Sequence, residues 1–349
     1  MLTEYLNRHK EDRFMQKILN WGVLSTAKIG WKQVVPAMQR SPYVNIAAVA
    51  SRSLQRAQAM ADDLAIAIAY GSYEELLSDP TIDAIYNPLP NHLHVPLTIQ
   101  AMRAGKDVLC EKPIALTRAE AEQLLAVSEE TGKRVEEAFM VCSNPQWLRV
   151  LELVEQGEIG KIMALQGAFS YFNNDSVNIR NQADIGGGGI YDIGCYLVMV
   201  SRMITGEEPC RLAASIDRDP QLKTDRLASV IMEFASGVQV TWLCSTQMVP
   251  FQRVNILGSK GRIEVEIPFN APTDKENRIF IDDGSVLGND GVRIETFAVA
   301  DQYQIQGELF SKAILDKQPF CVSLENSIAN MRIIDAIFSA AKTGTWQTL

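Results

Sequence analysis

Two short stretches of this chain combine side chains that can do acid–base chemistry with proline or glycine, the residues that most change what the backbone can do. In the first, Glu111-Lys112-Pro113 follows an apolar, strand-like run, and the proline restricts the backbone at Lys112. A lysine at the carboxyl end of a strand lies where open α/β sheets bind ligands. Its ammonium group is therefore a candidate catalytic cation, although an isolated tripeptide of this kind more often marks a surface lysine.

The second stretch is the glycine run from Gly186 to Gly189, followed by Asp192 and Tyr196. Glycines allow a backbone to pass close to a ligand or to a neighbouring strand. Asp192 and Tyr196 are four residues apart, so on a helix they share one face and can act as a pair. The alternative is an acid that stabilises the first turn of a helix, beside a tyrosine in the core.

The first apolar run of the chain, residues 18–25, leads into the pattern Ser25-x-Ala27-x-x-Gly30. Serine and alanine are small enough for a backbone to approach a pyrophosphate at a helix N-terminus, as glycines do in dinucleotide-binding turns. An ordinary tight strand–helix turn has a similar composition. The predicted cofactor contacts in this turn are Ser25, Thr26, Ala27, Lys28 and Ile29.

The second predicted strand ends in Ser51 and Arg52, with Arg56 one helical turn later and no acidic residue. Folds that bind NAD usually place an acid here for the ribose 2′-hydroxyl, whereas arginine accommodates the 2′-phosphate of NADP. A solvated loop arginine is the alternative. Because the forked guanidinium suits a phosphate, the position predicts NADP rather than NAD.

The fourth predicted strand ends in a turn with two prolines, Pro88-Leu89-Pro90-Asn91-His92. Judged alone, Asn91 or His92 is expected to cap the helix that follows. Beside a dinucleotide-binding turn, these residues are instead candidate cofactor contacts. The predicted contacts from this region are Pro88, Leu89, Asn91 and His92, together with Glu111 and Lys112 after the fifth strand.

Composition excludes several classes of protein. A net charge of −9 and a pI near 5.1 argue against a nucleic-acid or anionic membrane partner. No apolar run approaches the roughly 18 residues of a membrane span, and residues 1–16 lack the apolar core of a signal peptide. Six scattered cysteines without a Cys-x-x-Cys pair are typical of reduced thiols in a cytoplasmic protein. With three histidines, His9, His92 and His94, no metal site is predicted.

The pattern of elements predicts two domains. Residues 17–140 alternate strands that are apolar on both faces with helices, which indicates a parallel sheet covered on both sides, a Rossmann domain. Between residues 211 and 297, strand follows strand, so a large, mostly antiparallel open sheet is predicted in an α+β domain. The predicted fold class is α/β, with an N-terminal extension at 1–16, the Rossmann domain at 17–140 and the α+β domain at 141–349.

Together, the modified glycine turn, the proline turn, Glu-Lys-Pro and the glycine run with its Asp and Tyr resemble the Gfo/Idh/MocA oxidoreductase family over residues 17–345. Within it, the chain is most similar to the branch of glucose–fructose oxidoreductase, D-xylose dehydrogenase and dimeric dihydrodiol dehydrogenase. The resemblance implies an NADP-dependent dehydrogenase or reductase acting on CH–OH groups of a sugar, polyol or trans-diol. It places Lys112 beside the nicotinamide, Glu111 near the cofactor ribose, and Asp192 and Tyr196 in the same site.

By this resemblance, Tyr196 is the expected acid/base, Lys112 polarises the substrate oxygen, and Asp192 orients the lysine or a substrate hydroxyl. The Lys112 ammonium is expected to lower the tyrosine pKa from its usual value near 10. The two roles can also be exchanged, with Lys112 as the base. Two other functions stay open: a carbonyl reductase acting on an anhydro-sugar or biliverdin-like substrate, and a non-catalytic NADP-binding sensor.

The chain departs from the family pattern in two places. Ser25 and Ala27 replace glycines, and residues 141–144 read Val-Cys-Ser-Asn where related chains often carry Tyr-Arg-x-His. The usual sugar-hydroxyl contacts from this second segment are therefore not carried across to this chain. Relatives commonly pair through the C-terminal sheet, which implies a homodimer or homotetramer and makes residues 141–349 a substrate-binding and oligomerisation domain. A small-molecule substrate is the other expected partner.

Overall fold

The first half of the chain forms a parallel sheet that confirms the predicted Rossmann fold. The computed structural model describes residues 17–288 and 290–349, so the predicted extension at 1–16 lies outside the described residues. The strand order is β3-β2-β1-β4-β5-β6, and every neighbouring pair is parallel. The strands are β1 (Leu19–Leu24), β2 (Val44–Ala50), β3 (Ile68–Tyr70), β4 (Ala84–Asn87), β5 (Asp107–Cys110) and β6 (Val135–Glu137).

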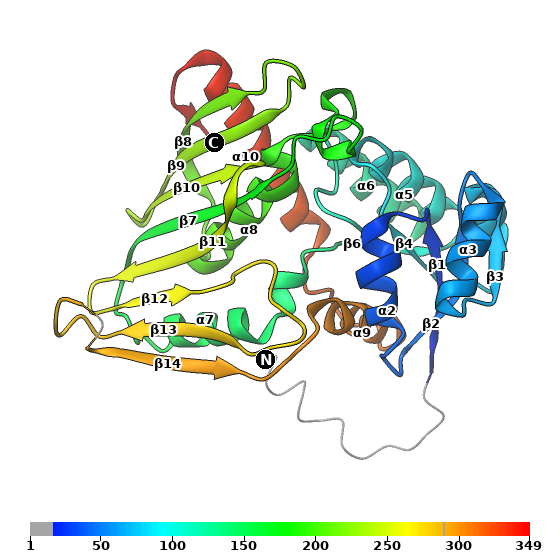
Figure 1. Ribbon diagram of the computed structural model, residues 1–349, viewed down its shortest axis with the longest axis horizontal. Helices are drawn as coiled ribbons and strands as arrows, with labels where there is room; N and C mark the ends of the chain where they lie inside the picture. Colours follow the sequence, from blue (N-terminus) through cyan, green and yellow to red (C-terminus); the bar gives the residue numbers. More distant parts are fainter. Residues whose placement is uncertain (1–16, 289) are drawn as a thin grey trace.

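Helices cover both faces of this sheet (Figure 1), because strands such as β4 and β5 are buried at every residue. Between β1 and β2 a π-helical turn, η1 (Gly30–Val34), leads into a short α-helix. The order of the strands reverses at β1, between β2 and β4, which is where such folds bind ligands at the carboxyl ends of the strands. The helices are α2 (Val35–Met38), α3 (Leu54–Leu64), α4 (Tyr73–Ser78), α5 (His94–Arg103) and α6 (Arg118–Thr131).

The second sheet confirms the predicted large, mostly antiparallel open sheet. Its order is β14-β13-β12-β11-β7-β10-β9-β8-β15, and among these pairs β7 and β10 are parallel while the others are antiparallel. The strands are β7 (Ile162–Phe172), β8 (Pro209–Arg218), β9 (Asp225–Phe234), β10 (Gln239–Ser245), β11 (Gln247–Gly258), β12 (Arg262–Val265), β13 (Asn277–Asp282), β14 (Val292–Phe297) and β15 (Gln347–Thr348).

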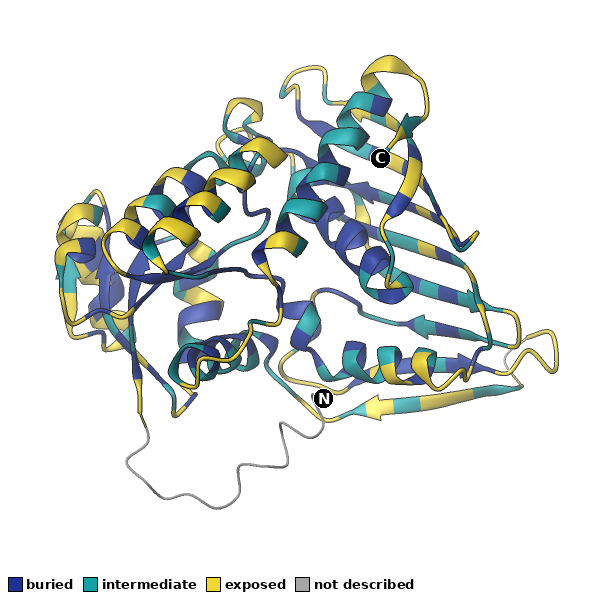
Figure 2. Ribbon diagram, turned by 180° about the vertical axis from the view of Figure 1, so that it is seen from behind, coloured by how far each residue is buried: buried dark blue, intermediate teal, exposed yellow. Residues whose placement is uncertain are grey.

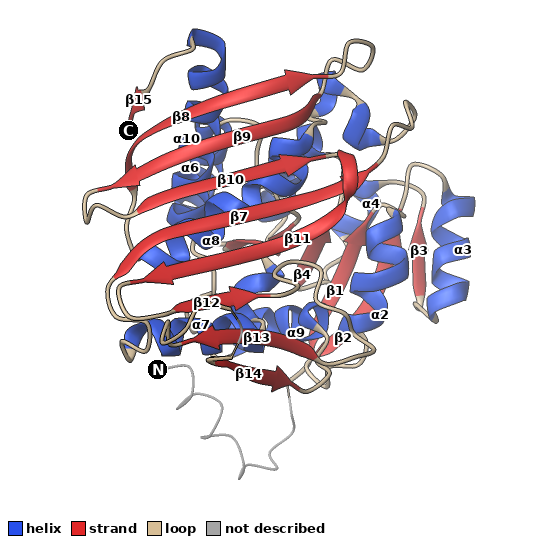
Figure 3. Cartoon of the chain, turned by 60° about the vertical axis from the view of Figure 1, so that its left-hand side comes forward, coloured by secondary structure: helices blue, strands red, loops and turns tan. Residues whose placement is uncertain are grey.

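Helices cover one face of the second sheet, and the other face is open (Figure 3). The covering helices are α7 (Pro145–Glu155), α8 (Cys195–Thr205) and α10 (Leu324–Thr343). Residues 195–202 of α8 are all buried, because this helix lies between the sheet and other elements (Figure 2). The α8 helix is therefore a rigid support for side chains at its N-terminal end.

A helix from the end of the chain packs back on the first sheet. The α9 helix (Gln302–Leu315) lies against α2 and β2 (Figure 1). On it, the ring of Phe310 lies 4.8 Å from that of Trp21 at an angle of 51°, and the Trp21 indole N–H donates to Ser311 Oγ at 3.1 Å. Residues from both sides of position 141 thus share one core, which ties the two domains together. Within residues 17–288 and 290–349, no helix combines the length and apolar character that a membrane crossing requires.

Candidate active site

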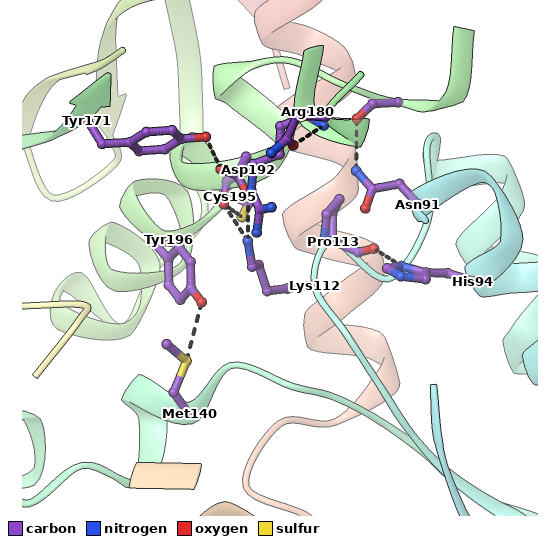
Figure 4. Close-up of polar contacts among 12 residues, drawn as sticks. Asn91, His94, Lys112, Pro113, Met140, Tyr171, Arg180, Asp192, Cys195 and Tyr196 are labelled. Carbon is purple, nitrogen blue, oxygen red and sulfur yellow. Dashed lines mark hydrogen bonds and ion pairs between the residues drawn. The ribbon is translucent and has the colours of Figure 1, made fainter. Parts of the chain in front are cut away.

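The two stretches with ionisable residues meet at the junction of the two domains. Lys112 follows β5 of the first sheet, and its Nζ donates to the backbone oxygen of Asp192 at 2.5 Å and lies 3.3 Å from Oδ1 of the same residue (Figure 4). The same Nζ lies 5.0 Å from the centroid of the Tyr196 ring. The fold therefore brings Lys112 into contact with Asp192 and Tyr196, which follow it by 80 or more residues.

Asp192 is the centre of a network of charged and polar groups. It lies in the π-helical turn η6 (Ile190–Gly194) just before α8. Besides Lys112, its carboxylate accepts hydrogen bonds from Arg180 Nε at 3.0 Å and from the Tyr171 hydroxyl at 2.5 Å. Asp192 therefore does more than stabilise a helix turn, but these partners do not include Tyr196, the residue that the four-residue spacing paired with it.

In this network, opposite charges stabilise each other's ionised forms although the groups are buried. Burial opposes ionisation of Asp192, but Lys112 and Arg180 together hold its pKa well below the usual range. Burial also lowers the pKa of Lys112, yet the neighbouring Asp192 outweighs it, so the lysine pKa is raised overall. Lys112 is consequently an ammonium ion and Asp192 a carboxylate at neutral pH.

Tyr196 contradicts the expected lowering of its pKa. Burial raises the pKa of this phenol well above its usual value, with Tyr303 and Glu111 acting in the same direction. The lysine faces the tyrosine ring, whereas the hydroxyl points away and donates to Met140 Sδ at 3.3 Å (Figure 4). The ring centroids of Phe139 and Phe269 lie 5.3 and 5.5 Å from the centroid of the Tyr196 ring. The prediction of a phenolate is therefore wrong for this structure, and Tyr196 keeps its proton.

Two members of the network, Tyr171 and Arg180, were not predicted from the sequence. Tyr171 lies near the end of β7, and Arg180 lies in the 3-10 turn Ile179–Asn181 before the glycine run. A tyrosine in an apolar strand and an arginine in a polar loop carry no distinctive spacing. Their role depends on Asp192, which reaches them only through the packing of separate elements.

The glycine run passes close to a neighbouring strand. At Gly188 the backbone has a φ of +126°, and a Cβ there would lie 1.9 Å from Asp225 Oδ1 at the start of β9. The other oxygen of Asp225 accepts the Ile190 N–H at 2.6 Å. Of the two uses expected for these glycines, the structure thus shows a close approach to a strand.

The proline turn after β4 contacts the glycine run, and this corrects the predicted helix cap. Asn91 Nδ2 donates to the Gly186 carbonyl oxygen at 2.8 Å. The α5 helix has Leu93 as its N-cap, without a side-chain hydrogen bond, so neither Asn91 nor His92 caps it. The Asn91 amide is used to join the two domains instead.

The turn after β1 begins with a residue in the left-handed conformation. Ser25 has a φ of +79°, the left-handed conformation that glycine provides in the usual pattern, and its Oγ accepts the Ala27 N–H at 3.2 Å. Thr26, Lys28 and Ile29 complete the turn, and Lys28 is exposed. The N–H groups of the first helical turn that follows lack intrahelical acceptors and can bind an anion.

Cationic side chains lie beside this turn at the end of β2. Ser51 is buried and its N–H donates to the Tyr70 carbonyl at 3.2 Å, whereas Arg52 and Arg56 are exposed. On the other side of β1, the Nδ1 atom of His92 is buried and has no hydrogen-bond partner among the described residues. Exposed guanidinium groups and an unsatisfied ring nitrogen fit an anionic, hydrogen-bonding cofactor.

The remaining predicted cofactor residues line the same edge of the sheet. Pro88 and Leu89 are buried in the turn after β4. Glu111 accepts a hydrogen bond from the Tyr86 hydroxyl at 2.6 Å, and burial raises its pKa. In the described part of the chain, no three His, Cys, Asp or Glu side chains gather as a metal site would require.

Comparison with known proteins agrees with this architecture. Residues 19–139 match the oxidoreductase family with an NAD-binding Rossmann fold, and residues 147–264 match the GFO/IDH/MocA C-terminal domain. The chain is 42% identical to an oxidoreductase of Rhizobium meliloti over 95% of this chain and 99% of the relative. It is 36% identical to the NADP⁺-dependent D-xylose 1-dehydrogenase 2 of Haloferax volcanii, covering 93% of this chain and 98% of that protein.

A solved structure shares the whole fold. A 3-ketoreductase from Actinomadura kijaniata, in complex with NADP and TDP-benzene, superposes with a TM-score of 0.87 at 27% identity, covering 93% of this chain and 98% of that one. The same reductase has also been solved with a single tyrosine or a single lysine replaced. From its matched domains and full-length relatives, this chain is a member of the Gfo/Idh/MocA family of NAD(P)-dependent oxidoreductases.

Proposed function

We propose that this protein is an NADP-dependent oxidoreductase that transfers a hydride between the nicotinamide and a CH–OH or carbonyl carbon of a sugar, polyol or trans-diol. The observation that carries the proposal is the Lys112 ammonium, held by Asp192 against the ring of Tyr196 where the two domains meet. The NADP-dependent xylose dehydrogenase and the NADP-bound ketoreductase support the cofactor and the substrate class. Bound NADP would supply or accept the hydride.

The residues of the site would manage the proton and the substrate oxygen. Lys112, kept charged by Asp192, would donate a hydrogen bond to that oxygen and stabilise negative charge as it develops. Tyr196, kept neutral by burial, would donate a proton when a carbonyl is reduced, and it would have to lose that proton before it could accept one from an alcohol.

One observation favours the reductive direction as a second candidate. Both Lys112 and Tyr196 carry protons, so the site holds two donors next to the carboxylate of Asp192. A carbonyl substrate needs a donor in the transition state, whereas an alcohol needs a base. The site can therefore act as a carbonyl reductase without Lys112 or Tyr196 first losing a proton.

A substrate screen tests the proposed function. Aldoses, polyols and trans-diols are incubated with NADP⁺, and the matching carbonyl compounds with NADPH, while the absorbance of NADPH is followed. We expect turnover of at least one compound class, with faster reduction than oxidation at neutral pH. Tight NADPH binding by fluorescence without turnover of any compound would favour the non-catalytic sensor.

Cofactor preference is expected to depend on Arg52. Replacing Arg52 by aspartate should lower kcat/KM with NADP roughly 10- to 100-fold, because one charge-assisted hydrogen bond to the 2′-phosphate is worth about 1.5–3 kcal/mol. Steady-state kinetics with both cofactors measure this. The matched control is Arg103→Asp. Arg103 is an exposed arginine at the end of α5, not next to β2, and it forms an ion pair with Glu130 at 3.3 Å. Equal kcat/KM of the wild-type protein with NADP and NAD would contradict the preference.

The open face of the second sheet is proposed to pair two chains. Ile231, Val249 and Phe251 lie on this sheet with 44%, 71% and 48% of their surface exposed, a concentration of apolar side chains that favours contact with another surface. Light scattering after size exclusion should show a dimer or tetramer, and Ile231→Glu should shift it to smaller species. Leu54→Glu, at an exposed leucine of α3, should not. A monomeric wild-type protein would contradict this proposal.

The predicted cytoplasmic location is also kept as a proposal. All six cysteines are free, and Cys110, Cys195 and Cys244 are buried. Reduced thiols of this kind suit a reducing compartment.

A further inference from the structure

The peptide group that joins Pro113 to Ile114, one residue beyond Lys112, is contacted on both sides by buried side chains. The Pro113 carbonyl oxygen lies 2.7 Å from His94 Nδ1 (Figure 4), and the N–H of the same peptide group, from Ile114, donates to Glu137 Oε1 at 2.9 Å. His94 and Glu137 are each 1% exposed. This peptide group, one residue beyond the candidate catalytic lysine, is thus bound at both its carbonyl oxygen and its N–H.

His94 also contacts the turn that is predicted to bind the cofactor. Its second ring nitrogen, Nε2, lies 2.7 Å from the Leu89 carbonyl oxygen. A neutral imidazole has one N–H, so it donates to one of these two carbonyls at a time. Burial lowers the pKa of His94 to about 4, with Lys112 and His92 acting in the same direction, so the imidazole is neutral at physiological pH.

The hydrogen bond from Ile114 to Glu137 distinguishes the two carbonyl oxygens as acceptors for the His94 N–H. When the Ile114 N–H donates to a carboxyl group, the peptide is polarised and its carbonyl oxygen becomes a stronger acceptor. That oxygen belongs to Pro113, and the Leu89 carbonyl gains nothing from this contact. The proton of His94 is therefore favoured on Nδ1, facing Pro113.

We propose that His94 and Glu137 are positioning residues that hold the Pro113–Ile114 peptide group, with His94 in the Nδ1–H tautomer, and thereby set the position of Lys112. The inference about Lys112 rests on the proposed function, whereas the tautomer does not. Burying two ionisable side chains costs free energy, and here each is matched by a contact with the loop that carries the lysine.

The adjacent residue provides a matched control. Glu136 lies on the same strand, is 3% exposed, and accepts a backbone N–H from Val322 at 3.1 Å. It has the same side chain, burial and type of contact as Glu137, but it binds a segment away from Lys112. Replacing Glu136 by leucine therefore reproduces the loss of a buried carboxyl group without touching the Pro113–Ile114 peptide.

The first test uses nitrogen NMR of the imidazole rings in the cofactor-free protein, whose three histidines give few signals. His94→Phe assigns the His94 resonances. We expect the Nδ1–H tautomer in the wild-type protein and in Glu136→Leu, and a shift toward Nε2–H in Glu137→Leu. An Nε2–H tautomer in the wild-type protein, or an unchanged tautomer in Glu137→Leu, overturns the arrangement whether or not the protein turns over a substrate.

The second test uses turnover of the full-length protein with NADPH and the substrate found in the screen. Because a displacement of about 1 Å can cost roughly 100-fold in rate, Glu137→Leu should lower kcat by about 10- to 100-fold with little change in KM. Glu137→Gln retains an acceptor oxygen and should restore most of the activity. Glu136→Leu should lower Tm and leave kcat unchanged.

The two positioning residues should also be non-additive. Since both act on one peptide group, His94→Phe combined with Glu137→Leu should lower kcat little more than the stronger single substitution does. Additive losses, or an equal loss of kcat in Glu136→Leu, would overturn the positioning role. An inactive wild-type protein that still shows the Nδ1–H tautomer would contradict the proposed function and retain the arrangement of His94 and Glu137.

Discussion

Replacing Lys112 by methionine is expected to lower kcat by roughly a thousandfold, since it removes a charged donor at the reacting oxygen. The structure holds this ammonium with two contacts to Asp192, at 2.5 and 3.3 Å, and the carboxylate raises its pKa. Methionine has a similar length and no charge, so it removes the donor and retains most of the volume. Single-turnover kinetics with saturating NADPH measure the loss at the chemical step.

Lys106 is the matched control for this substitution. It is 5% exposed and its Nζ donates to the backbone oxygens of Asp79 and Ile82, both at 2.6 Å. Lys106→Met should therefore lower the free energy of unfolding and leave kcat close to wild type. If Lys112→Met retained near wild-type kcat with the true substrate, the assignment of the active site would fail.

Replacing Asp192 by asparagine is expected to lower kcat/KM roughly 100-fold and to move the alkaline limb of the pH–rate profile to lower pH. The direction of this shift follows from the charges of Asp192 and Lys112. Asp192 opposes the effect of burial on Lys112 and raises its pKa, so without this carboxylate the ammonium loses its proton at a lower pH than in the wild-type protein. Profiles of kcat/KM against pH for both proteins measure the shift.

Tyr171→Phe provides a graded comparison for the Asp192 variant. It removes the hydroxyl that donates to Asp192 Oδ2 at 2.5 Å and leaves the carboxylate and its ion pairs in place. Its effect on kcat/KM should be smaller, with a much smaller shift of the alkaline limb. An alkaline limb that does not move in Asp192→Asn would show that the ionisation of Lys112 does not control the rate.

The residues at the ends of the parallel strands could be predicted because topology places them. Strands that are buried on both faces and alternate with helices form a parallel sheet, and their carboxyl ends share one edge. Ser25, Ser51, Leu89 and Lys112 follow β1, β2, β4 and β5, and the structure has all of them at that edge. This prediction did not depend on how elements far apart in the sequence pack against each other.

The interactions across the two domains could not be predicted in the same way. Tyr171 and Arg180 reach Asp192 only because β7, the 3-10 turn and the π-helical turn meet, and neither residue has a distinctive spacing. The Asn91 amide, expected to cap α5, instead binds the Gly186 carbonyl across the domain junction. In both cases the partner lies on an element whose placement depends on side-chain packing.

By itself, the sequence determined the fold class, the family and the identity of the residues that carry charge near the strand ends, because periodicity and spacing are local properties. Only the tertiary structure decided their protonation and their partners. Lys112 faces the ring of Tyr196 and not its oxygen, while aromatic rings from distant segments bury the phenol. Burial raises the pKa of Tyr196 and Asp192 raises that of Lys112, so the candidate site holds two proton donors where the charge of Lys112 had been expected to favour a phenolate.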